Sequence, residues 1–243
     1  MKVEAVEYVD GSQKLIGKLV RDETKTGKQP TIILFHAFEG LAEFTINYAK
    51  NIAAKGFIVF APDMYGNGET ARDFDGCCKL YMPFTQDREL ARRRAVLAYT
   101  TILKNPDVDA NKIGAMGFCF GGMCMLELAR SGENMRAGVG AHSILAKSTL
   151  PTHAIKASML MLQGYQDPQV PPTELKAFAQ EMDEADVDDW SIMFFGHAKH
   201  SFTDPATGSY DAVKEKEVGR EYNEIAAKRT FQYAMDFFKE KLA

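Results

Sequence analysis

The stretch Gly117-Phe118-Cys119-Phe120-Gly121-Gly122 decides the fold. It lies between a strand-like run, Lys112–Phe118, and an apolar segment with helical spacing, Gly121–Arg130. In the related G-x-S-x-G turn the nucleophile occupies a strained strand-to-helix corner, where any Cβ on the flanking glycines would clash with the backbone. Cys119 is therefore predicted to stand at a helix N-terminus, whose dipole and free N–H groups favour a thiolate. The alternative is a buried cysteine that only packs.

The rest of the chain alternates predicted strands and helices. Val3–Val9 and Lys14–Val20 are β-rich runs separated by turn formers, so they are predicted to form an antiparallel hairpin. Pro30–Phe35 is a continuous apolar run, which is typical of a strand buried on both faces of a parallel sheet. Further strands are predicted at Phe57–Phe60, Arg136–Ala141, Ala157–Leu162 and Trp190–Phe195, and further helices at Ala42–Lys55, Asp87–Lys104, Thr173–Glu184 and Ile225–Leu242.

This alternation predicts an α/β fold, with a mostly parallel sheet, an N-terminal antiparallel hairpin and helices on both faces. No repeat or linker marks a second domain, so residues 1–243 are predicted to form one domain. Met64–Phe84 has no clear period and is predicted to be a long irregular loop above the sheet. Ligands of such sheets bind beyond the carboxyl ends of the strands, so the chemistry is expected in the loops that follow them.

Two of these loops carry further candidate catalytic residues. Asp167 follows one predicted strand, in a Gly- and Pro-rich loop where an Asp is commonly a turn former. His197 and His200 follow the next strand, and a loop His on its own is usually a solvated side chain. Nucleophile, acid and His nevertheless occur in the order that triads on this kind of turn require. We predict Cys119 as nucleophile, His200 as base and Asp167 as the residue that orients the imidazole, with His197 as a solvated or pocket group.

Composition excludes several classes of partner. The chain of 243 residues has 29 basic and 33 acidic side chains, a net charge of −4 and no basic cluster, so nucleic acid is not an expected partner. Its longest apolar stretches fall far short of the roughly 18 residues that cross a bilayer, so no membrane span is expected. The four cysteines (Cys77, Cys78, Cys119, Cys124), without a signal-like leader, indicate a reducing cytoplasm rather than a disulfide framework.

Five segments together resemble the dienelactone hydrolase family: GFCFGG (117–122), LQGYQDPQVP (162–171), AKHSF (198–202), FHAFEG (35–40) and FAPDMYG (60–66). The resemblance covers essentially the whole chain. It implies an α/β-hydrolase sandwich without a large lid domain and a triad of Cys119, His200 and Asp167. It also implies an oxyanion hole made by the backbone N–H groups of Phe120 and Phe38.

Two positions depart from the family's pattern. The type enzyme has a Glu, which holds the resting thiol, directly after the position of His36, where this chain has Ala37. Glu39, two residues further on, either reaches the pocket or is a solvated carboxylate. The type enzyme also has an Arg four residues after its catalytic His, which grips the substrate carboxylate. This chain has Asp204 there, which would repel a carboxylate.

The residues and the resemblance predict a hydrolase that cleaves an ester or a lactone through a thioacyl-enzyme. The mechanism needs no metal or organic cofactor, and the histidines match no zinc-binding spacing. Arg72, Arg88 or another cation of Met64–Phe84 and its flank could replace the family's Arg, although charged residues in such a segment are usually solvated. The expected pocket residues, which could instead belong to a satellite core, are His36, Glu39, Tyr65 and Tyr81.

Two other classes of function stay open. A thiol-redox protein would cycle Cys119 with Cys124, or Cys77 with Cys78, through disulfides. Cys119 and Cys124 are roughly one and a half helical turns apart, so their side chains are expected on different faces. A non-catalytic α/β scaffold that binds a small ligand is the other alternative, because a fold alone does not define an activity.

Overall fold

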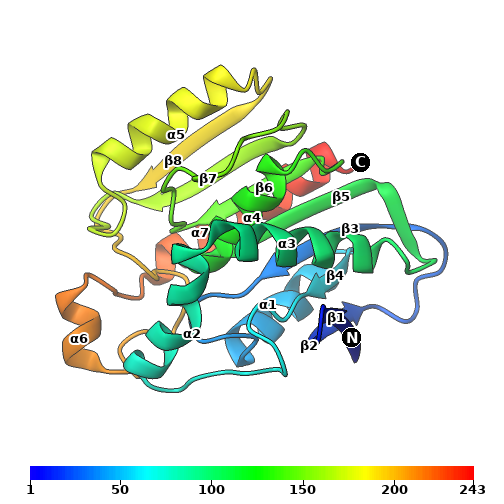
Figure 1. The fold of residues 1–243 in the computed structure, drawn as a ribbon, viewed down its shortest axis with the longest axis horizontal. Coiled ribbons are helices and arrows are strands. Elements are labelled where there is room, and N and C mark those ends of the chain that lie inside the picture. Colours follow the sequence, from blue (N-terminus) through cyan, green and yellow to red (C-terminus); the bar gives the residue numbers. More distant parts are fainter.

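The computed structural model describes all 243 residues, and eight strands form a single sheet (Figure 1). Across the sheet the order is β1 (Lys2–Asp10), β2 (Gln13–Arg21), β4 (Ile58–Ala61), β3 (Gln29–Phe35), β5 (Val108–Phe118), β6 (Ala137–Ala141), β7 (Ser158–Gly164) and β8 (Trp190–Phe195). β1 and β2 form an antiparallel hairpin, and β2 is antiparallel to β4. All pairs from β4 to β8 are parallel, which confirms the predicted hairpin and the mostly parallel sheet.

Helices cover both faces of this sheet. α1 (Glu43–Ala53) lies beside α7 (Glu224–Lys241), and α3 (Arg88–Ile102) lies beside α4 (Phe120–Arg130). Gly114 of β5 faces α7, whereas Gly117, an odd number of residues further on, faces α4. Because side chains alternate along a strand, these two helix pairs cover opposite faces. α5 (Pro172–Glu184) follows β7 in the chain. None of the helices has the length and apolar character that crossing a membrane requires.

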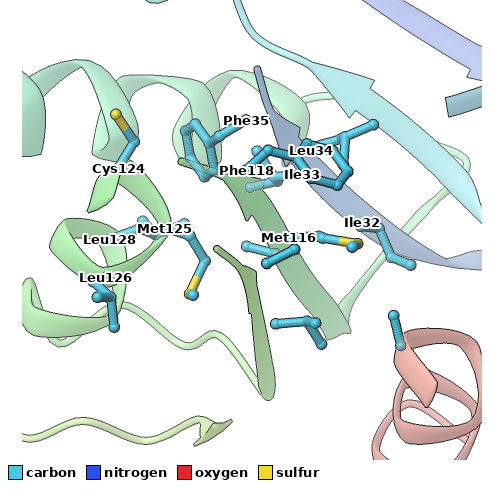
Figure 2. Close-up of a cluster of buried hydrophobic side chains, with 14 of the residues drawn as sticks. Ile32, Ile33, Leu34, Phe35, Met116, Phe118, Cys124, Met125, Leu126 and Leu128 are labelled. Atoms are coloured by element: carbon cyan, nitrogen blue, oxygen red, sulfur yellow. The ribbon is translucent and has the colours of Figure 1, made fainter. Parts of the chain in front are cut away.

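The core is densest where β3, β5 and α4 meet (Figure 2). The side chains of Ile32–Phe35 on β3 are fully buried, as the continuous apolar run predicts. Met116 and Phe118 of β5 lie next to them. All eleven residues of α4 are buried, so the helix that begins directly after Cys119 is fixed within the core.

The segment Met64–Phe84 differs from the prediction in its second half. Residues 74–86 form α2 (Phe74–Gln86), whose first turn is capped by the Asp73 side chain, which accepts a hydrogen bond from the Gly76 N–H at 2.8 Å. The prediction of an irregular loop is therefore wrong for α2. The helix contains Gly76 and Pro83, two residues that usually mark loops, and it buries only Cys77 and Phe84. A second short helix, α6 (Ala212–Glu217), was not predicted either, and it buries only one residue.

The contact between β3 and α4 generates a stability prediction. A Cβ on Gly121 would overlap the backbone carbonyl groups of Phe35 and His36, which cannot move aside. Gly121→Ala is expected to lower the free energy of unfolding by more than about 2 kcal/mol, measured by chemical denaturation. Gly196→Ala is the matched control, because a Cβ there meets nothing within 4 Å. Equal losses in the two variants would contradict this account of the packing.

Candidate active site

Cys119 occupies a strained corner between β5 and α4. Its φ of 52° and ψ of −115° lie outside the regions that L-residues normally adopt. A Cβ on Gly117 would overlap the backbone of Gly121, so the corner can close only because both residues are glycines. The Ile144 N–H also donates to the Cys119 carbonyl at 3.2 Å. The sequence G-x-C-x-G-G thus forms the tight strand-to-helix turn that its glycines predict.

His200 and Asp167 meet at the carboxyl edge of the sheet. Asp167 Oδ2 lies 2.7 Å from His200 Nδ1, and both side chains are completely buried. With a carboxylate at this distance, Nδ1 carries a proton and donates it to the hydrogen bond. Asp167 Oδ1 in turn accepts the Gln169 N–H at 2.8 Å, which fixes the carboxylate. His197, the alternative considered from the sequence, is exposed to solvent.

Cys119 and His200 influence each other's protonation. Burial is the largest influence on the Cys119 thiol and raises its pKa, but the charge and hydrogen bond of His200, the charge of Arg220 and the Phe120 N–H together leave this pKa below its ordinary value. Burial lowers the pKa of His200, but the charges of Cys119 and Asp167 outweigh it and raise this pKa to about 9. His200 Nε2 has no other hydrogen-bond partner, and the Cys119 sulfur lies close enough for a long hydrogen bond and for each charge to shift the pKa of the other group. Both shifts favour a thiolate–imidazolium pair.

The backbone N–H groups of Phe120 and Phe38 are expected to form an oxyanion hole, and both residues lie near Cys119. The Phe120 N–H helps to lower the pKa of the Cys119 thiol, as an amide directed at the sulfur does. The Phe38 N–H makes no hydrogen bond to another backbone group. This N–H shares its peptide with the Ala37 carbonyl, which lies 2.7 Å from His36 Nδ1 and accepts the Gly40 N–H at 3.3 Å, and the next peptide is held by the Tyr65 hydroxyl, which donates to the Phe38 carbonyl at 2.9 Å. An unpaired N–H on a fixed peptide is suited to bind a developing negative charge.

A cavity of about 160 Å³ opens beside Cys119. Of the expected pocket residues, Tyr81 lines it, whereas His36, Glu39 and Tyr65 do not. The complete lining is Phe38, Phe74, Cys78, Tyr81, Cys119, Ile144, Gln169, Val218 and Arg220. Most of these side chains are apolar, so the cavity suits a small and largely apolar group.

His36 and Tyr65 lie behind the cavity and support its wall. His36 Nδ1 lies 2.7 Å from the Ala37 carbonyl, and Nε2 accepts the Met64 N–H at 3.3 Å. Burial lowers the pKa of His36, which favours the neutral ring that this pattern requires. The Tyr65 ring contacts His36 at a centroid distance of 4.7 Å and stacks on Phe120 at 5.5 Å. These two residues join the loops after β3 and β4.

Arg220 is the cationic side chain of the cavity, and the sequence analysis missed it. Its guanidinium lies 3.9 Å above the Phe38 ring, Nε contacts Glu215 at 3.1 Å and Nη2 donates to Ser201 Oγ at 3.0 Å. No sequence motif marks this position. An isolated parallel β-bridge pairs the backbone of Arg220 with that of His200 and so brings Arg220 to the site. The expected cations lie elsewhere: Arg72 is exposed, and Arg88 is buried against Glu127 and the Ala146 carbonyl.

Glu39 is buried rather than solvated. Only 1% of its surface is exposed, and neither carboxyl oxygen has a hydrogen-bond partner. Burial and the charge of Asp204 raise the pKa of Glu39 to about 8, so the side chain is mainly neutral at pH 7. Burial also raises the pKa of Asp204. Glu39 and Asp204 therefore belong to one buried acidic group beside Arg220.

Known proteins resemble this chain in sequence and in fold. Residues 16–242 match the model of the Dienelactone hydrolase family. A solved dienelactone hydrolase-like promiscuous phosphotriesterase from metagenomic libraries is 33% identical, with a TM-score of 0.90 over 100% of this chain and 99% of that one. An uncharacterized protein of Caenorhabditis elegans is 32% identical over 65% of this chain and 99% of its own length. The carboxymethylenebutenolidase homolog of Mus musculus is 24% identical over 63% of this chain and 62% of its own length.

The burial of Glu39 predicts how stability depends on pH. An unfolded Glu ionises near its ordinary pKa of 4.5, whereas folded Glu39 keeps its proton up to about 8. Between these two pH values, the free energy of unfolding of the wild type falls by up to about 1.4 kcal/mol for each unit that the pH rises. The Gln side chain of Glu39→Gln cannot ionise, so this variant does not lose stability in this way as the pH rises. The unfolding free energy of Glu39→Gln minus that of the wild type is therefore expected to grow between about pH 5 and pH 8, measured by denaturation. A difference independent of pH would contradict the raised pKa.

Proposed function

The chain belongs to the dienelactone hydrolase family, whose members hydrolyse esters and lactones, and we propose that it does so with Cys119, His200 and Asp167. The observation that carries the proposal is the buried hydrogen bond of 2.7 Å between Asp167 and His200, beside a thiol whose pKa the imidazole lowers. Nucleophile, base and orienting carboxylate are the parts that acyl transfer requires.

The first half of the proposed reaction forms a thioacyl-enzyme. The Cys119 thiolate attacks the carbonyl carbon, and the backbone N–H groups of Phe120 and Phe38 stabilise the oxygen as it becomes negative. The carbon–oxygen bond of the ester or lactone then breaks. The His200 imidazolium donates its Nε2 proton to the departing oxygen, so the alcohol leaves uncharged. In a lactone this alcohol stays attached to the acyl group.

The second half returns the enzyme to its starting state. Neutral His200 takes a proton from a water molecule, which attacks the thioacyl carbon. The carbon–sulfur bond breaks and the carboxylic acid leaves. Asp167 keeps the proton on Nδ1 throughout, so that Nε2 is the nitrogen that exchanges protons with the reactants. No metal or organic cofactor takes part in these steps.

The charges around the cavity favour a compact, neutral substrate. Arg220 already forms an ion pair with Glu215, so its charge is largely balanced within the protein. Asp204 is also close enough for its charge to influence Glu39. A substrate carboxylate would lose its hydration there and gain little net attraction. Short neutral esters and small lactones fit both the charge and the volume of about 160 Å³.

In this proposal residues 1–243 act as one catalytic domain in the cytoplasm, on a small ester or lactone. Nucleic acid and membranes are not partners. The support for a cytoplasmic location is the set of four free cysteines, which a reducing compartment preserves.

Hydrolysis of p-nitrophenyl acetate tests the assignments of Cys119 and His200. Cys119→Ala and His200→Ala are each expected to lower kcat/KM by at least about 100-fold, because each removes a group that takes part in the transition state. His197→Ala is the matched control, since this exposed His should retain wild-type activity. Mass spectrometry of the enzyme quenched during turnover should find the acyl group on Cys119. Equal activity in all four proteins would remove the hydrolase mechanism.

A pair of substrates tests the inference about charge. p-Nitrophenyl butyrate and mono-p-nitrophenyl succinate have acyl groups of similar length, but only the second ends in a carboxylate. The butyrate is expected to have a kcat/KM at least about tenfold higher, which corresponds to about 1.4 kcal/mol of transition-state stabilisation. A preference for the succinate ester would instead assign the Arg220 charge to substrate binding.

A further inference from the structure

A second thiol lines the cavity that contains the nucleophile. Cys78, on α2, is half-buried and shares the lining with Cys119. Its neighbour Cys77 is fully buried, and its Sγ contacts the Ala71 carbonyl at 3.7 Å. Cys124 lies in the core among the apolar side chains of α4 (Figure 2). Of the other three cysteines, only Cys78 therefore shares a solvent-filled space with Cys119.

The two thiols of the cavity differ in their readiness to react. The charge of His200 lowers the pKa of Cys119 in spite of burial, whereas burial and Asp75 raise the pKa of Cys78. Arg220 acts in the same direction on both, because its positive charge lowers each pKa. One sulfur is thus a ready nucleophile and the other a protonated thiol nearby. Pairs of this kind, an attacking and a resolving cysteine, form disulfides after oxidation.

We propose that a hydroperoxide oxidises Cys119 and that Cys78 then closes a reversible disulfide with it. The Cys119 thiolate attacks one peroxide oxygen, the O–O bond breaks, and the departing oxygen takes up a proton and leaves as water or an alcohol. Cys119 becomes a sulfenic acid. The Cys78 sulfur then attacks the Cys119 sulfur, the S–O bond breaks, and the oxygen leaves as water with the Cys78 proton. The thiols lose two electrons and the peroxide gains two.

Bridged cysteines have Cα atoms only about 4.4–6.8 Å apart, so α2 must be able to bring Cys78 within that range of Cys119. α2 is suited to such a movement, since it buries only two of its thirteen residues. Its exposed Asp75 forms an ion pair with Lys214 of α6 at 2.6 Å, and exposed pairs of this type hold an element weakly. Figure 1 shows that α2 and α6 lie outside the layers that cover the sheet. α4, which carries Cys119, is fixed in the core and remains in place.

The disulfide would have two effects on the active site: it would prevent over-oxidation of Cys119, and it would stop hydrolysis. It prevents further oxidation of Cys119 to the sulfinic acid, which ordinary thiols do not reverse. It also removes the nucleophile, so hydrolysis stops until a reductant restores the thiols. This last consequence rests on the proposed function, whereas the disulfide itself does not.

Hydrogen peroxide and peptide mapping test the disulfide. The reduced full-length protein is treated with hydrogen peroxide, its free thiols are alkylated, and proteolytic peptides are analysed by mass spectrometry without reduction. The expected product is a peptide pair that joins Cys78 to Cys119. Cys77→Ser is the matched control and should form the same pair. Cys78→Ser should form none and should instead accumulate sulfinic acid on Cys119.

Recovery of activity gives a second measurement. After peroxide, dithiothreitol should restore several-fold more of each protein's own starting activity in wild type and Cys77→Ser than in Cys78→Ser. Sulfinic acid on Cys119 of the wild type without the peptide pair would overturn the proposal, as would a pair that joins Cys119 to Cys77. The wild-type map decides this even if a variant fails to fold. A Cys78–Cys119 pair in a protein without esterase activity would support the disulfide and contradict the hydrolase.

Discussion

The backbone conformation of Cys119 is the constraint on which the site depends. A non-glycine residue in such a region costs on the order of 1–3 kcal/mol and persists only where its surroundings impose it. Here the Cys119 N–H donates to Ala141 on the neighbouring strand, and its carbonyl accepts from Gly122, Met123 and Ile144. α4 is buried along its whole length, so the corner cannot relax without separating the helix from β3 and β5. The packing that fills the core therefore also fixes the position of the nucleophile.

Burial and charge act together at this corner. An isolated buried thiol would hold its proton and an isolated buried imidazole would stay neutral, because a low-dielectric environment penalises the charged forms. In Cys119 and His200 this penalty is offset, because each group supplies the opposite charge to the other. Asp167 adds a second negative charge beside His200 Nδ1. Glu39 has no such partner and responds to burial by keeping its proton. The same burial thus produces a charged pair and, nearby, a neutral acid.

The sequence predicts those parts of the molecule whose local pattern matches their environment. Pro30–Phe35 is apolar throughout because both faces of β3 are covered, and the glycines at 117, 121 and 122 are required by contacts that any Cβ would break. α2 was missed because Gly76 and Pro83, which usually mark loops, lie within it, and α6 was missed because six residues are too few to show an apolar period. Arg220 was missed for another reason. Arg220 reaches the cavity through a backbone β-bridge to His200, twenty residues earlier. A tertiary contact of this kind leaves no pattern in the neighbouring sequence.

The departures from the family's pattern change how the loop after β3 is held. Where a Glu and an Arg would bring charges towards the thiol and the substrate, this chain has Ala37 and Asp204. The peptides on either side of Phe38 are instead held by His36 Nδ1 at the Ala37 carbonyl and by the Tyr65 hydroxyl at the Phe38 carbonyl. The Arg220 guanidinium lies above the Phe38 ring. Arg220 in turn is anchored to Glu215 on α6. The peptide proposed to bind the oxyanion is therefore held by uncharged groups, and the charge of the nearby Arg220 is balanced by Glu215. This is why we propose that the shape of the cavity, rather than a free charge, selects the substrate.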